Sequence, residues 1–97
     1  MRDIATGWTI VMTNKTEEML IITMEECGEL IQACSKVIRT GGRAKYRRNL
    51  RDEIGDVMCM IEILKMSGMV TEGQIQERMK EKETKLRKWS NIFEDEK

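Results

Sequence analysis

The sequence predicts an all-α protein, a small bundle of three main helices that follows an N-terminal arm and is completed by homo-oligomerisation. Proline is absent, aromatic residues make up 4% of the chain, and methionine occurs nine times. This composition favours helices over strands. The 97 residues suffice for one domain, here assigned to 1–97. A domain this small leaves much of its surface exposed when it folds alone, so we expect a partner subunit.

The helix boundaries follow from capping signals and glycines. Asn14 begins the first helix and has capping-box spacing to Glu17. Asn49 is a plausible N-cap for the second helix, and Thr71, with Gln74 three residues later, for the third. The predicted elements are an N-terminal arm at 1–13, helices at 14–40, 49–66 and 71–90, and a basic loop at 41–48.

The apolar pattern of each helix predicts how it packs. The residues from Met19 to Met24 cover most of the first helix's circumference, so a partner chain is expected to cover what a three-helix monomer leaves exposed. The second helix carries a wide apolar stripe. The third is highly charged and is expected to have one packed edge, with Trp89 in phase with Leu86 as a packing residue.

Charge and cysteine content restrict the function classes. The 17 basic and 17 acidic residues cancel, so no global field attracts nucleic acid or anionic lipid. Cys27, Cys34 and Cys59 form no C-x-x-C pair, and we interpret them as reduced core residues of a cytoplasmic protein. The longest apolar run is 57–61, so neither a signal peptide nor a membrane span is expected.

Two acidic pairs, each with a glycine inside an apolar run, are the strongest functional signal. Glu26 and Glu29 flank Gly28, and Glu53 and Asp56 flank Gly55. Residues three apart lie about 60° apart on a helix, so each pair shares a face. Like charges at this spacing, and a glycine inside a helix, are both unfavourable. A bound dication and a close helix approach at the glycines would compensate for these costs.

The ligand types indicate which metal the acids would bind. Glu25 adds a third acid within one turn of Glu26 and Glu29. Carboxylate oxygens suit Mg²⁺ or Mn²⁺, and the chain contains no histidine, which argues against zinc and against a di-iron bundle. The alternative is a solvated acidic stripe, the commoner fate of helical glutamates. We favour the metal because the pattern occurs twice and interrupts apolar runs.

A basic segment lies between the two acidic pairs, and no acid occurs from Arg39 to Arg51. Arginine offers bidentate geometry to phosphate oxygens, and Gly41 and Gly42 would let backbone amides approach a phosphate. An ordinary solvated linker is the alternative interpretation of such a segment.

The acidic motifs resemble a known family. Glu25-Glu26-x-x-Glu29 followed by Glu53-x-x-Asp56 is similar to the E-E-x-x-E and E-x-x-D signature of the MazG-like all-α nucleoside triphosphate pyrophosphohydrolases, and the resemblance covers roughly 14–89. It implies a homo-oligomeric enzyme, dimer or tetramer, that cleaves a nucleoside triphosphate to monophosphate and pyrophosphate with Mg²⁺, in nucleotide-pool housecleaning.

The resemblance also implies roles for individual residues. Glu26, Glu29, Glu53 and Asp56 would be the metal ligands, with Glu25 orienting water or supporting the ligands. Phosphate contacts would come from nearby cations, and the candidates are Lys36, Arg43, Arg47, Lys82 and Lys85. Without histidine, carboxylates are the plausible general bases near neutral pH.

Other interpretations stay open at this point. Trp8 and Tyr46 could stack on a nucleobase or simply pack. The protein could be a non-catalytic helical oligomer that binds a nucleotide or protein partner and uses the acids as a structural metal site. Residues 39–51 could contact nucleic acid, which is the less favoured hypothesis.

Overall fold

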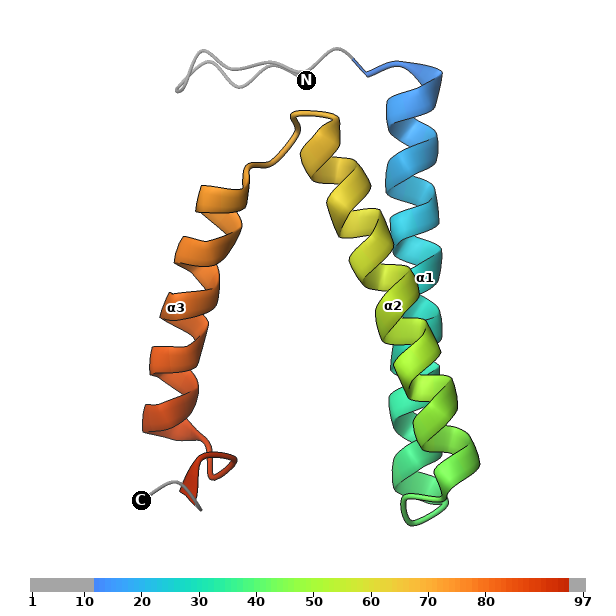
Figure 1. Ribbon diagram of the computed structural model, residues 1–97, viewed down its shortest axis with the longest axis vertical. Coiled ribbons are helices and arrows are strands. Elements are labelled where there is room, and N and C mark those ends of the chain that lie inside the picture. Colours follow the sequence, from blue (N-terminus) through green and yellow to red (C-terminus); the bar gives the residue numbers. More distant parts are fainter. Residues whose placement is uncertain (1–11, 95–97) are drawn as a thin grey trace.

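A computed structural model describes residues 12–94 and contains, within that range, three α-helices and no strand. These are α1 (Asn14–Arg39), α2 (Ala44–Met66) and α3 (Glu72–Trp89) (Figure 1). The predicted all-helical class and the number of main helices are confirmed. Trp8 and nearly all of the expected N-terminal arm lie outside the described residues.

The first helix begins and ends at well-defined caps. Thr13, rather than the expected Asn14, is the N-cap, and its hydroxyl accepts a hydrogen bond from the Thr16 amide at 3.0 Å. At the other end, Gly41 and Gly42 adopt φ of 70° and 84°, a region that favours glycine. The Gly42 amide donates to the Val37 carbonyl, which closes a Schellman-type C-cap and turns the chain back.

The second helix starts five residues before the predicted position, so the basic loop expected at 41–48 is wrong. Only 40–43 separate α1 from α2, and the basic residues after Arg43 are helical. Arg43 is the N-cap and offers no side-chain cap hydrogen bond. The expected cap Asn49 lies inside the helix because alanine, lysine and arginine propagate a helix well without one.

The connection between α2 and α3 also follows local signals. Gly68, at φ 84°, ends α2 after Ser67. Thr71 and Gln74 form the predicted capping box, with both reciprocal bonds at 3.1 Å. Lys65 pairs with Glu72, which ties the first turn of α3 to the last turn of α2.

The packed part of the described chain is the antiparallel pair α1 and α2. Ala33 from α1 and Met60 from α2 are its buried residues. Figure 1 shows α3 standing apart from this pair, and none of its residues is buried. The expected packed edge of α3 is therefore wrong for the single chain, and Trp89 is 78% exposed. None of the described helices is long and apolar enough to span a membrane.

One side of the α1–α2 pair carries exposed apolar side chains, which we call the apolar face. Its exposed residues on the two helices include Met24, Ile31, Ile38, Ile54 and Met58. The three cysteines are exposed as well, so their assignment to the core was wrong. The core is small because two helices have only one line of contact.

The helical glycines do not mark a close helix approach. A Cβ atom added at Gly28 or at Gly55 would meet no atom within 4 Å. Both residues point away from the contact between α1 and α2, since each is about 160° around its helix from the inner acid of its motif. The expected compensation at these glycines is absent from the described residues.

Candidate metal centre

Four carboxylates meet where α1 and α2 pack. Glu26 and Glu29 come from α1, and Glu53 and Asp56 come from α2. One ligand oxygen from each lies within 4.8 Å of those from the other three. We call this group the acidic cluster. The antiparallel hairpin produces it, because the tight Gly41–Gly42 turn brings the two i, i+3 pairs to the same level.

The cluster has an inner and an outer half. Glu26 and Glu53 are half-buried, whereas Glu29 and Asp56 are exposed. The inner acids lie on the contact line between the helices, and the outer acids are each displaced from it by about 60° in the same rotational sense. In an antiparallel pair, the same rotation on both helices puts Glu29 and Asp56 on one face of the pair. The residues of the apolar face are rotated in the opposite sense, so the cluster opens on the side opposite the apolar face.

The inner carboxylates are electrostatically unfavourable without a cation. Burial raises the pKa of Glu26, and the charges of Glu29 and Asp56 raise it further. Burial, together with the adjacent Glu29 carboxyl, raises the pKa of Glu53 to about 6. The Glu26 Oε2 atom is buried and has no hydrogen-bond partner among residues 12–94. A buried, unpartnered carboxylate oxygen is expected to be satisfied by another group.

A divalent cation fits these residues. Oxygen ligands of one Mg²⁺ lie at about 2.0–2.1 Å from the ion, so the widest separation between two of them is about 4.2 Å. The acidic cluster is within 4.8 Å across, which small side-chain rotations would close. An all-oxygen donor set is typical of Mg²⁺ and Mn²⁺ sites.

The sequence comparison agrees with this geometry. The family model of the MazG nucleotide pyrophosphohydrolase domain matches residues 14–88, more than three quarters of the chain and all of α1 and α2. The chain belongs to the MazG family. Comparison with curated proteins and with solved structures gives no match. The family points to hydrolysis of a nucleotide phosphoanhydride, and the acidic cluster lies within the matched residues.

Glu25 was also predicted as a site residue. It lies beside the acidic cluster but is not one of its four carboxylates. Its side chain is exposed, and its charge contributes to the raised pKa of Glu26. It lies about 40° around α1 from Glu29, toward the same open face. This position suits a role next to the metal rather than as one of its ligands.

The predicted phosphate-binding cations separate into three groups. Lys36 follows Glu29 by seven residues and lines a hollow near the end of the hairpin. Arg43 and Arg47 do not line this hollow, and Arg47 is about 120° around α2 from Glu53, toward the apolar face. Lys82 and Lys85 are exposed on α3, which the structure keeps apart from the cluster.

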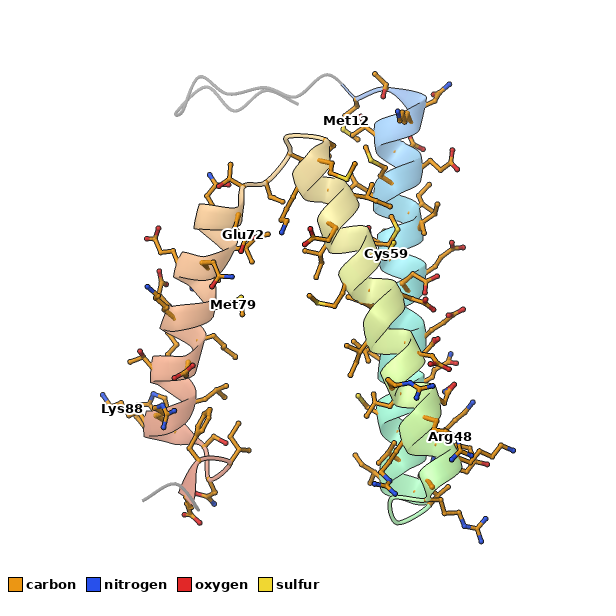
Figure 2. All side chains as sticks on the ribbon, viewed as in Figure 1. Met12, Arg48, Cys59, Glu72, Met79 and Lys88 are labelled. Atoms are coloured by element: carbon orange, nitrogen blue, oxygen red, sulfur yellow. The ribbon has the colours of Figure 1, made fainter. Side chains whose placement is uncertain are left out.

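Three further cations lie at the hairpin end beside Lys36. Arg39, Lys45 and Arg48 line the same hollow as Lys36. Figure 2 shows Arg48 near the hairpin end of α2, on the side away from α3. All three belong to the basic segment that was predicted to contact phosphate, but Arg43 and Arg47 were chosen from it instead, because α2 was predicted to start at Asn49. Extending the helix back to Ala44 puts Lys45 in register with Asp52 and Asp56, which would have identified it.

Proposed function

We propose that the protein is a Mg²⁺-dependent nucleoside triphosphate pyrophosphohydrolase that releases the monophosphate and pyrophosphate, acts on nucleotide pools and works as a homo-oligomer. The observation that carries this proposal is the convergence of four carboxylates from two helices within a MazG domain. A mere solvated stripe would not place a buried, unpartnered Glu26 oxygen at its centre.

The chemistry assigns distinct tasks to the acids. Glu26, Glu29, Glu53 and Asp56 would hold the dication, Mg²⁺ or Mn²⁺. When bound, the cation neutralises phosphate charge and lowers the pKa of water. Water attacks the α-phosphorus, the bond from that phosphorus to the bridging oxygen breaks, and the bridging oxygen leaves with pyrophosphate. Glu25, exposed beside the cluster, would orient this water and accept its proton.

The homo-oligomer part of the proposal is supported by the exposed apolar surface. Ile31 and Ile38 on α1 are 70% and 81% exposed, and Met58 on α2 is 51% exposed. Large exposed apolar side chains on one face are typical of a surface that binds another protein chain, and the α1–α2 hairpin itself buries only Ala33 and Met60 among residues 12–94. A second copy supplies a matching face by symmetry. Covering this face leaves the acidic cluster open to substrate, because the cluster opens on the opposite side.

The test is a pyrophosphate-release assay over the common and modified nucleoside triphosphates, with Mg²⁺ and then with a chelator. We expect release from at least one substrate with Mg²⁺ and none with the chelator. Glu26→Gln should remove the activity, because Glu26 would supply one of the two inner ligands. Metal binding without any pyrophosphate release would instead favour the non-catalytic oligomer with a structural metal.

A further inference from the structure

The third helix carries a stripe of large side chains that α1 and α2 leave largely uncovered. Its members recur at alternating intervals of four and three residues, the spacing by which one helix packs along others. We call them the α3 seam: Ile75, Met79, Lys82, Leu86 and Trp89. They lie within about 80° of one another around the helix. Met79 is 56% exposed, Trp89 is 78% exposed, and no residue of α3 is buried. Such a stripe is typical of a helix that packs against a partner.

The connection to α2 keeps α3 away from its own hairpin. Only 67–71 separate the two helices. The Lys65 amine pairs with Glu62 at 2.6 Å and also with Glu72, so it ties the first turn of α3 to the end of α2. Figure 1 shows α3 diverging from α2 beyond this tie. Among the described helices α1 and α2 form the packed pair, so the α3 seam and the apolar face do not meet within one chain.

The surface left unpacked is large enough for a stable association. The radius of gyration is 17.0 Å, whereas a compact domain of 97 residues has about 12.5 Å. The accessible surface is 8319 Å², whereas a compact monomer of 11.3 kDa exposes about 5700 Å². The difference is greater than the roughly 800 Å² that each partner buries in a standard interface. A second copy of the chain can therefore supply the missing contacts.

The α3 seam and the apolar face match in length and in chemistry. The 18 residues of α3 extend over about 27 Å, and the 23 residues of α2 over about 34 Å, so the apolar face can receive the whole seam. Methionines occur on both surfaces, Met24 and Met58 on the apolar face and Met79 in the seam. Their unbranched side chains adapt to irregular contacts.

A pair of α3 helices would be a poorer arrangement. Lys82 occupies the centre of the seam, seven residues from both Ile75 and Trp89. Two copies of α3 would bring two lysine amines together in the middle of the contact, whether the helices are parallel and in register or antiparallel. On the apolar face, one Lys82 can lay its methylene stem along the contact and extend its amine past the edge. The hairpin is therefore the better partner for the seam.

We propose that two copies of the chain exchange their third helices, so that the α3 seam of each copy packs on the apolar face of the other. This inference rests on the homo-oligomer part of the proposed function and names the element that covers the apolar face. The exchange is symmetric, because each copy gives one helix and receives one. The acidic cluster opens on the opposite side of the hairpin, so both clusters stay accessible.

Two charge variants of the full chain test the exchange, one on each surface. Met79→Lys places a cation in the α3 seam, and Ile31→Glu places an acid in the apolar face; both side chains are more than half exposed in the single chain, so each variant should fold. Each variant alone has a charge in both exchanged contacts and should sediment as a monomer at micromolar concentration. The matched control is Thr84→Lys, since Thr84 is exposed on α3 about 180° from Ile75, and it should assemble as the unmodified protein does.

Mixing the two variants in equal amounts distinguishes exchange from contacts within one chain. In the mixed dimer, the unmodified seam of the Ile31→Glu copy meets the unmodified apolar face of the Met79→Lys copy. The other contact pairs the introduced cation with the introduced acid. Native mass spectrometry should therefore find dimers with one copy of each variant. Their dissociation constant should be at least about tenfold below that of either variant alone, because burial of even one large apolar side chain contributes about 1.5–3 kcal/mol.

The other outcomes overturn the exchange, and each points to a different arrangement. A Met79→Lys variant that stays dimeric would show that hairpins associate without α3, which leaves the oligomer proposal intact. An Ile31→Glu variant that stays dimeric would show that α3 seams pair with each other. Two monomeric variants, both helical by circular dichroism, that form no mixed dimer would place α3 on its own hairpin. A monomeric unmodified protein would contradict the exchange and the oligomer proposal together, whereas the pyrophosphate-release assay tests the catalytic part of the proposed function separately.

Discussion

Replacing one outer ligand of the acidic cluster tests the metal site. Glu29→Gln and Asp56→Asn each keep the shape of the side chain and remove one of four carboxylate charges gathered within 4.8 Å. Both side chains are exposed, so neither change leaves a cavity or a buried unpaired group. The helical fold should persist in both variants.

The size of the effect follows from the charge count. A dication bound by four carboxylates loses about a quarter of its direct Coulomb attraction when one becomes an amide. Replacing a residue that only hydrogen-bonds to a metal ligand lowers metal affinity by about 10–100-fold. Loss of a direct ligand should therefore lower Mg²⁺ affinity by at least about 100-fold. Activity should fall below detection at millimolar Mg²⁺. The metal-free variants should melt at the same temperature as the unmodified protein or higher, because carboxylate repulsion is relieved.

The assay combines Mg²⁺ titration by calorimetry, pyrophosphate release and circular dichroism. Glu18→Gln is the matched control, since Glu18 is an exposed acid on the same helix outside the cluster, and it should behave as the unmodified protein. If both cluster variants hydrolyse substrate at the unmodified rate, the four-carboxylate site is refuted.

Three further predictions concern pH, the core and assembly. Burial and neighbouring carboxyls raise the pKa of Glu53 from its ordinary 4.5 to about 6, so the folded metal-free protein binds this proton more tightly than the unfolded chain. Its free energy of unfolding should therefore fall as the pH rises through this window, and saturating Mg²⁺ should reverse the trend in thermal melts; an unchanged profile would contradict the assignment. Ala33→Leu overpacks a position that is 1% exposed and should cost about 1–3 kcal/mol in chemical denaturation, whereas a neutral effect would show that α1 and α2 are not in contact there. Light scattering at micromolar concentration should find a dimer or larger, and Ile31→Glu/Met58→Glu should reduce it to monomer; a monodisperse 11.3 kDa unmodified protein would end the oligomer proposal.

The sequence predicted what local chemistry determines. Acids at i, i+3 on two helices must each share a face, and the glycine pair after α1 ends one helix and allows a short return. These two facts are enough to bring Glu26 and Glu53 together. The Thr71 capping box was likewise predictable, because both of its hydrogen bonds are made within four residues.

The errors have physical causes too. The start of α2 was misplaced because it has no capping side chain, and Asn49 has the properties of a cap without being used as one. Periodicity shows which stripe of a helix is apolar, but not what covers it. Trp89 was therefore predicted to pack within its own chain, whereas it is exposed on α3, which lies apart from α1 and α2.

Identifying the bond that is cleaved tests the proposed pyrophosphohydrolase activity most directly. Hydrolysis of a nucleoside triphosphate in ¹⁸O-labelled water with Mg²⁺, followed by mass spectrometry of the products, distinguishes attack at the α-phosphorus from attack elsewhere. We expect equal amounts of pyrophosphate and monophosphate, with the label in the monophosphate. Release of orthophosphate and diphosphate, or label in the pyrophosphate, would contradict it.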